Sequence, residues 1–349
     1  MNRKNSWSAF VVGAGLAGAA QAQSQLSTYN LIVRDTLAQA NRVYGRVIAQ
    51  NINLAGEDRV VEVGTRLGSS NSDGITPIPS QSTPSLLVGG YINANDDDDD
   101  DDDDTIRVMN GSAFLDDTSG SAPSSRISLQ QSSNGATIQR ANPTGSSQAA
   151  TFDSVFNAVV TEASTYATRA SNASFSSSGN TTTFTIPAST SVRQVVFSLT
   201  EAQAETIFEN QNGQVQFNLN GRQVSSIDSI IVNIAGFDSG ANFSNLANFL
   251  GTITSNLSFR SRVLWNFHQH DGDITLDRSW YGSILAPEAT LEGDSDLVGS
   301  AAVKNILFNA EIHGPAWAGV PEPSTYAAIS FVVAVGGMTV WRRRRASKV

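Results

Sequence analysis

The chain reads Tyr281-Gly282-Ser283-Ile284-Leu285-Ala286-Pro287-Glu288-Ala289-Thr290-Leu291 and, a few residues later, Leu297-Val298-Gly299-Ser300-Ala301-Ala302-Val303. In both segments a turn precedes a Gly-Ser pair, and a short apolar run follows it. Brief strands with glycine at the tight corners between them suit a β-solenoid, in which each coil stacks on the next.

Short apolar alternations of a similar kind recur from Tyr29 onward. They are Leu31/Val33, Val43/Val47, Val60/Val63, Leu86/Val88, Ile106/Val108 and Ile127/Leu129. Gaps of roughly 12 to 25 residues separate them, which indicates an all-β fold with many brief strands. The repeat is irregular, so the periodicity alone fits either a β-solenoid or a β-sandwich.

Two segments interrupt the β pattern with helical spacing. Thr151–Arg169 carries apolar residues three and four apart, which predicts one long amphipathic helix lying alongside the sheet with its aromatic stripe in the core. A shorter helix is predicted at Thr200–Glu209, where Thr200 and Gln203 fit a capping box. Strands are predicted around it at Thr183–Ile186, Val192–Phe197, Val215–Leu219 and Ile227–Ile234.

The first residues have the layout of a secretory signal peptide. A basic start with Arg3 and Lys4 precedes an apolar stretch, and Ala20-Gln21-Ala22 supplies a small-residue cleavage site, so residues 1–22 are the predicted signal peptide. The apolar stretch also contains a G-x-G-x-x-G pattern from Gly13 to Gly18. No amphipathic helix pattern follows it, which argues against a dinucleotide-binding fold.

The last residues, 320–349, form a second export device. Pro321-Glu322-Pro323-Ser324 leads into the uncharged run Tyr326–Trp341, and Arg342-Arg343-Arg344-Arg345 ends it. The run has roughly 16 residues, against about 20 for a comfortable membrane span, so it predicts a short transmembrane helix. Four arginines are costly to translocate, which keeps them in the cytoplasm and leaves residues 23–319 outside.

Composition limits the partners of this exported body. The signal peptide removes two cations and the tail removes five, so the formal net charge of −10 becomes −17 if Glu322 stays with the body. Such an acidic chain repels nucleic acid and anionic lipid. It has no cysteine, so burial and backbone hydrogen bonds must hold the fold without disulfides.

Candidates for catalysis are few. His268 and His270 alternate on a predicted strand beside Asp271, an arrangement that could supply metal ligands, although histidines next to a turn are commonly at the surface. The carboxylates of Asp271, Asp273, Asp294 and Asp296 gather at predicted turns. They could act as paired acids on a glycoside, but aspartates in turns usually cap backbone N–H groups. A non-enzyme is expected, with a polysaccharide lyase or hydrolase on a β-helix as the alternative.

Asp96–Asp104 is a run of nine consecutive aspartates. The carboxylates repel one another, which predicts a solvated polyanionic loop. A spacer is one interpretation, and loose Ca²⁺ binding that uses Asp96, Asp100 and Asp104 is the other, because extracellular calcium sites need only weak affinity. No defined metal site and no other cofactor is expected.

The segment Val263-Leu264-Trp265-Asn266-Phe267, together with the Gly-Ser segments, resembles the end of the choice-of-anchor A family, whose signature is "LWNF … GSILAPNA … G". Glu288 replaces the common asparagine. The opening strands Tyr29–Val33 and Val43–Val47 also resemble the family, although Ala49-Gln50 stands where Gly-Gly is usual. The resemblance covers Ser24–Gly319. It implies an ice-binding-like adhesive β-solenoid with a helix alongside, joined to interchangeable surface anchors.

The tail resembles the PEP-CTERM sorting signal of Gram-negative bacteria. This implies recognition by an exosortase, cleavage near Pro321–Ser324 and transfer to the cell surface or extracellular polysaccharide, with an uncut membrane anchor as the alternative. Together these features predict a non-catalytic adhesion or biofilm-matrix protein that binds polysaccharide. Ice binding would need a flat array of threonines, of which the sequence offers only Thr181-Thr182-Thr183-Phe184-Thr185.

Overall fold

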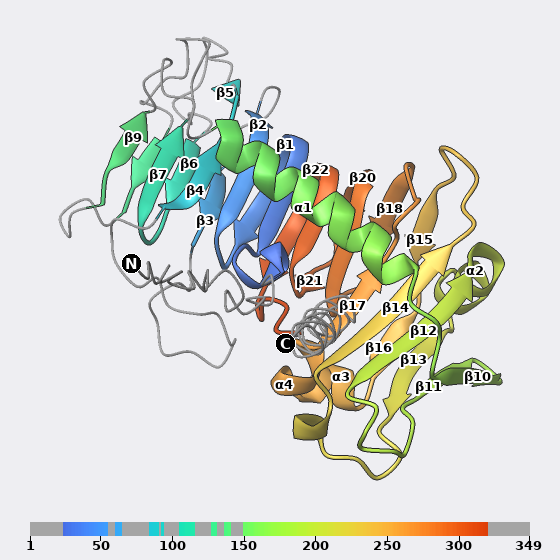
Figure 1. The fold of residues 1–349 in the computed structure, drawn as a ribbon. Helices are drawn as coiled ribbons and strands as arrows, with labels where there is room; N and C mark the ends of the chain where they lie inside the picture. Colours follow the sequence, from blue (N-terminus) through green and yellow to red (C-terminus); the bar gives the residue numbers. More distant parts are fainter. Residues whose placement is uncertain are drawn as a thin grey trace, which may run out of the picture. The chain divides into compact units, whose positions relative to one another are not determined.

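Parallel strands stack in a β-solenoid (Figure 1). The computed structural model describes residues 24–54, 60–64, 84–90, 92–93, 105–115, 127–130, 136–140 and 149–319. The predicted signal peptide, the tail from Val320 and the aspartate run lie outside these residues. No helix among the residues described has both the length and the apolar character needed to cross a membrane.

The described strands of the larger sheet fall into three ladders, one for each side of the coils. The first contains β12 (Gln194–Thr200), β14 (Ser229–Ala235), β17 (Val263–Asn266), the first parts of β20 (Ser283–Gly293), β22 (Ala301–His313), β1 (Leu31–Val43) and β2 (Val47–Asn53), then β4 (Pro84–Val88), β7 (Ser112–Leu115) and β9 (Ile138–Arg140). The second contains β15 (Phe243–Asn245), β18 (Asp273–Leu276), the later parts of β20, β22, β1 and β2, and β5 (Ile92–Asn93). The third contains β19 (Trp280–Tyr281), β21 (Leu297–Val298), the ends of β22 and β1, β3 (Val60–Val63), β6 (Thr105–Val108) and β8 (Ile127–Leu129). All of these pairs are parallel, which excludes the antiparallel β-sandwich that the sequence left open.

The order of the coils in space differs from their order in the chain. The early coils stack away from β1 toward β9, and α1 (Ala149–Ala167) then runs back along the stack (Figure 1). The later coils return from β12 until β22 pairs with β20 on one side and with β1 on the other. The last strand of the body, β22, therefore lies next to the first strand, β1, and joins the later coils to the early ones.

Alternation within the strands produces two apolar cores. On β1, Leu31 and Val33 point into the solenoid, while Ile32 between them packs beneath α1. The helix buries Phe152 and Tyr166 over the same outer side of the sheet. The predicted long helix with a buried aromatic stripe is thus confirmed.

A separate four-stranded sheet lies beside the later coils. It contains β10 (Ser174–Ser178), β11 (Thr181–Thr185), β13 (Gln214–Asn218) and β16 (Asn248–Leu250). β10 and β11 form an antiparallel hairpin, and β11, β13 and β16 are parallel. The predicted strands at residues 183–186, 192–197, 215–219 and 227–234 correspond to β11, β12, β13 and β14, with boundaries shifted by up to three residues.

Short helices complete the coils. In α2 (Glu201–Phe208), Thr200 accepts a hydrogen bond from the backbone N–H of Gln203, whose side chain accepts one from the backbone N–H of Thr200, so the predicted capping box is confirmed. The remaining helices in the part of the chain that the structure describes are α3 (Thr252–Ser255), α4 (Leu257–Arg260), and the 3₁₀ turns Gln25–Ser27 and Val224–Ser226.

Candidate functional site

The outward side of the four-stranded sheet carries a regular array of uncharged polar side chains. Every second residue of each strand points away from the core. We call these side chains the polar face: Ser174, Ser176, Ser178, Thr181, Thr183, Thr185, Gln214, Gln216, Asn218 and Asn248. No carboxylate, ammonium or guanidinium group belongs to the array, although the chain as a whole has a formal charge of −10.

The strand register places these side chains in rows across the sheet. One row runs Ser176, Thr183 and Gln216, and the next runs Ser178, Thr181 and Gln214. Gln216 Nε2 donates to Thr183 Oγ1 at 3.0 Å, and Thr181 Oγ1 donates to Gln214 Oε1 at 3.0 Å. Neighbouring strands are about 4.8 Å apart and alternate residues about 6.7 Å apart, so the array offers hydroxyl and amide groups at a fixed repeat.

Aromatic residues on the inward side hold this array in register. Phe184 and Phe217, on neighbouring strands, are buried and stack with ring centroids 5.2 Å apart. Phe184 also meets Trp265 of β17 edge to face at 5.8 Å. A slip of one residue would expose these rings and bury the polar side chains, so burial fixes which residues point outward.

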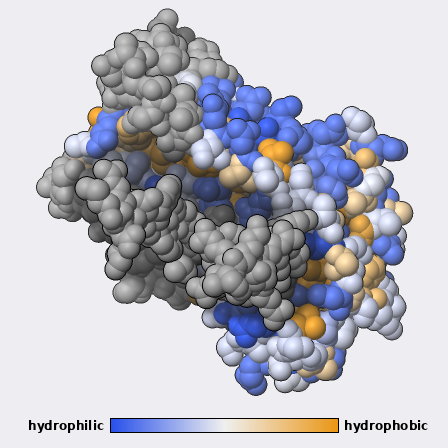
Figure 2. Space-filling view, in the orientation of Figure 1, coloured by the Kyte–Doolittle hydropathy of each residue, from blue (hydrophilic) through white to orange (hydrophobic). Residues whose placement is uncertain are grey.

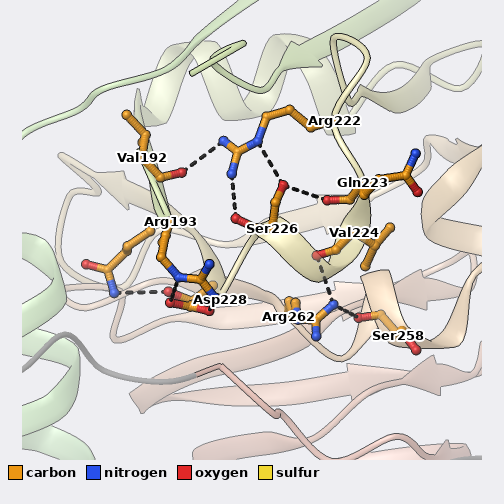
Figure 3. A network of polar contacts seen from close by, with 11 residues as sticks. Val192, Arg193, Arg222, Gln223, Val224, Ser226, Asp228, Ser258 and Arg262 are labelled. Atoms are coloured by element: carbon orange, nitrogen blue, oxygen red, sulfur yellow. Dashed lines mark hydrogen bonds and ion pairs between the residues drawn. The ribbon is translucent and has the colours of Figure 1, made fainter. Parts of the chain in front are cut away.

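A buried arginine fixes the loops that lead out of this sheet (Figure 3). Arg222 is 5% exposed, and its guanidinium donates to the carbonyl oxygens of Val192 and Ser226 at 2.9 and 2.6 Å. It also donates to the carbonyl oxygen of Pro187 at 3.1 Å. Nearby, Arg193 pairs with Asp228 through both carboxylate oxygens. Burial lowers the pKa of Arg222, and the charge of Arg193 lowers it further. Because the guanidinium of Arg222 donates to carbonyl groups at Pro187 and Val192 in one loop and at Ser226 in the other, it holds the two loops together.

The border of the polar face differs in chemistry from its centre. Leu250 of β16 is 37% exposed, and the guanidinium of Arg278 donates to Asn248 Oδ1 at 2.9 Å. Half-buried Tyr281 packs against Phe249 of β16 with ring centroids 5.8 Å apart, and the guanidinium carbon of Arg260 lies 5.1 Å from its ring centroid. On the side of the molecule drawn in Figure 2, the described surface is mostly blue or pale, with small separate orange patches. The array therefore suits an extended polar ligand better than an apolar one.

The predicted histidine pair is wrong in its placement. β17 ends at Asn266, so His268 and His270 follow it in a turn rather than alternating on a strand. His270 is completely buried, with Nε2 3.1 Å from the carbonyl oxygen of Asp273, and its ring lies 4.3 Å from that of Phe237. Burial lowers the pKa of both histidines and favours their neutral forms. Within the described ranges, no three His, Asp or Glu side chains converge to hold a metal ion.

The predicted carboxylates lie in turns or at strand ends. Asp271 accepts hydrogen bonds from Ser239 Oγ at 2.8 Å and from the Gly240 N–H at 2.7 Å, and these bonds lower its pKa. Asp273 starts β18, whereas Asp294 follows the far end of β20. Asp296 accepts from the Glu311 N–H at 3.2 Å and lies 3.3 Å from His313 Nε2. Asp271 and Asp296 therefore accept hydrogen bonds from backbone N–H groups, as aspartates in turns commonly do.

Other predicted sites lie outside the described residues. They are the candidate calcium ligands Asp96, Asp100 and Asp104, the sorting motif Pro321, Glu322, Pro323 and Ser324, and the stop-transfer cluster Arg342, Arg343, Arg344 and Arg345. They remain predictions.

The polar face was only partly visible in the sequence. Thr181–Thr185 stood out as a local threonine cluster, but the matching serine and amide rows on β10 and β13 were missed. The signal that could have revealed them is the shared polar-apolar alternation of Ser174–Ser178, Thr181–Thr185 and Gln214–Asn218. Alternation does not specify which strands become neighbours.

Comparison with protein families matches residues 22–314 to the family described as "Putative Ice-binding-like adhesive domain". Among solved structures, the chain is similar to an ice binding protein from an Antarctic Biological Consortium, with 13% identity and a TM-score of 0.27 over 70% of this chain and 91% of that one. It is also similar to an ice binding protein from an Antarctic bacterium Flavobacteriaceae, with 12% identity and a TM-score of 0.23 over 79% of this chain and 62% of that one. No curated protein matches the chain.

Proposed function

The chain belongs to the family of ice-binding-like adhesive domains, and on that basis we propose that it is a surface-associated, non-catalytic protein that attaches to extracellular polysaccharide. The observation that carries this proposal is the polar face, a fixed array of hydroxyl and amide groups without a charge. Polysaccharides present hydroxyl groups at regular intervals, and such groups can exchange hydrogen bonds with serine, threonine, asparagine and glutamine side chains. Each bond contributes little alone, so affinity depends on many bonds forming together.

We further propose how the protein reaches the surface. Residues 1–22 direct export, the body at 23–319 is of the choice-of-anchor A type, and residues 320–349 are a PEP-CTERM signal. An exosortase recognises Pro321–Ser324 while the tail spans the inner membrane, and the body passes to the cell surface or the biofilm matrix. The resemblance of the two ends to export and sorting signals supports this route, and so does the family's adhesive character.

Binding to an insoluble neutral polysaccharide, with cellulose as the first probe, tests the proposal. The full chain is purified in mild detergent and compared with the double variant Thr183→Val, Gln216→Leu. This variant removes hydrogen-bonding groups from the row formed by Ser176, Thr183 and Gln216. Loss of two bonds of about 1 kcal/mol each predicts roughly thirtyfold weaker retention.

The matched control is Thr275→Val. Thr275 is an outward threonine on β18, away from the polar face, and donates to Glu292 Oε1 at 2.7 Å. Its replacement should leave retention unchanged. If the double variant and the control bind alike, or if the unaltered chain binds none of a panel of neutral polysaccharides, the proposal is overturned.

A further inference from the structure

The outer edge of β10 is open, whereas two other strand edges at the same end of the stack are closed. On β12, the Val196 N–H donates to Asn172 Oδ1 at 2.9 Å, and the Asn172 N–H donates to the carbonyl oxygen of Val196 at 3.0 Å. On β15, the Ser244 N–H donates to Glu209 Oε1 at 3.3 Å, and the following Leu246 N–H donates to Phe208 O at 2.7 Å. β10 pairs with β11 on one side. Among the described residues, no strand pairs with its other side.

β10 also lacks the features that usually protect an edge strand. Natural edges carry charges, prolines or bulges that prevent pairing with another chain. β10 reads Ser174-Phe175-Ser176-Ser177-Ser178, its serines are exposed, and it pairs with β11 without a register shift. No charged residue occurs between Ala170 and Val192. Its backbone groups are therefore free to pair with a compatible strand.

We propose that β10 pairs antiparallel with β10 of a second copy of this chain. An antiparallel pair of identical strands is self-complementary about a two-fold axis, so the same surface serves both copies. Two acidic chains repel each other, and the uncharged edge is a place where they can approach with little electrostatic cost. The two four-stranded sheets then form one continuous sheet across the axis.

The geometry specifies one register. Residues directly opposite in an antiparallel pair point to the same side of the sheet. Continuity of the polar face requires outward residues to meet outward residues, so Ser176 lies opposite Ser176 of the second copy and Ser174 lies opposite Ser178. This register also pairs the whole of β10, and it joins two polar faces into a surface of twice the width.

Cysteine cross-linking can test this register directly, because the chain contains no cysteine. Opposite residues have Cα atoms about 4.5–5.5 Å apart, within the range that a disulfide spans. The full chain with Ser176→Cys, treated with a mild oxidant, should give a covalent species of twice the 36.9 kDa mass of the chain. Thr183→Cys is the control, because it lies on the same polar face one strand farther in, and its two copies would be about 14 Å apart.

A mixture of Ser174→Cys and Ser178→Cys chains extends the test. The two variants should cross-link with each other and much less with themselves, which also covers the case in which Ser176→Cys fails to fold. Equal cross-linking of Ser176→Cys and Thr183→Cys would indicate random collision and overturn the proposal, as would the absence of cross-links from both Ser176→Cys and the mixture.

Sedimentation of the full chain in detergent supplies a second measurement. Ser176→Lys places two ammonium groups opposite each other and should weaken dimerisation at least tenfold, while Thr183→Lys adds the same charge one strand away and should change it little. A chain that sediments as a monomer at all concentrations overturns the dimer. Polysaccharide retention can still be measured on that monomer, so the failure of one proposal is distinguishable from the failure of the other.

Discussion

Asn233 and Asn266 lie at paired positions on β14 and β17, and their buried side chains form a ladder beneath the end of α1. Asn266 Nδ2 donates to Asn233 Oδ1 at 2.8 Å and to the carbonyl oxygen of Ala163 at 2.9 Å. Asn233 Nδ2 donates to the carbonyl oxygen of Tyr166 at 2.8 Å. The carbonyl of Tyr166 lies in the last turn of α1, where it has no partner within the helix, so Asn233 shares it with the Arg169 N–H at 3.1 Å and the ladder positions the helix end.

Replacing Asn266 with leucine should destabilise the protein. The change removes two buried hydrogen bonds and leaves polar atoms of the ladder without partners, at a cost of about 2–3 kcal/mol. Urea unfolding of the full chain measures it. Asn157→Leu, an exposed position on α1, is the control and should change stability by less than about 0.5 kcal/mol. Equal effects of the two changes would contradict the role of the ladder.

The sequence predicted local features well because they depend on neighbouring residues. The stripe of α1 follows helical spacing, and the capping box of α2 involves Thr200 and Gln203 within one turn. The closing pair of β22 with β1 joins residues such as Leu31 and Ala301, and their strands carry no local mark of being neighbours. The same holds for the polar face, whose rows depend on register between strands.

The misplaced histidines have a related cause. An apolar run continues from Val263 to Phe267, and His268 and His270 extend its alternation. In the structure the strand stops at Asn266, and the chain turns so that Phe267 and His270 enter the core beside Phe237. Tertiary packing therefore ended the strand earlier than the alternation predicted.

Stability should depend on pH through Glu162. Its half-buried carboxyl accepts hydrogen bonds from Ser24 Oγ at 2.9 Å and Tyr166 Oη at 2.7 Å, and burial raises its pKa. A carboxyl that binds its proton more tightly in the folded state contributes stability that is complete below its unfolded pKa of about 4.3. That contribution is lost as the pH rises through the folded pKa.

Glu162→Gln removes this titration. The melting temperature of the unaltered chain, minus that of the variant, should fall as the pH rises from about 4 through the raised pKa. Thermal scans across this range measure the difference, and the subtraction cancels the carboxylates that both proteins share. A difference that stays constant or rises with pH would contradict the prediction.

Gly299 should tolerate no side chain. A Cβ at this position would lie 2.4 Å from the carbonyl oxygen of Gly282 and 2.9 Å from the backbone nitrogen of Ser283, in the preceding Gly-Ser corner. Gly299→Ala must shift stacked backbone and should cost about 1–3 kcal/mol or more in urea unfolding. Gly221→Ala is the comparison: its φ of +78° is strained for alanine, but no atom lies within 4 Å. A smaller cost at Gly299 than at Gly221 would show that the coils can separate there.

Surface display should require the arginine cluster. Deletion of Arg342–Arg345 removes the charges predicted to hold the tail in the cytoplasm, so fractionation of native cells should show the body lost from the surface. Deletion of Ala346–Val349, which leaves the four arginines in place, is the control. Unchanged display without the arginines would mean that the tail is not the sorting signal we propose.

Attachment to acidic polysaccharide should depend on Ca²⁺ through Asp96–Asp104. Neighbouring carboxylates repel by about 1 kcal/mol per pair even in water, and physiological salt screens this only beyond ~8 Å. Millimolar Ca²⁺ would relieve the repulsion and could bridge the run to carboxylates of the polysaccharide.

Replacing all nine aspartates with asparagine should therefore abolish the Ca²⁺-dependent part of retention on a polyuronate, while the unfolding midpoint and export stay the same. Retention on cellulose, which has no carboxylates, should not change, because it depends on the polar face. If the asparagine variant is retained on the polyuronate as well as the unaltered chain at the same Ca²⁺ concentration, the aspartate run is a spacer.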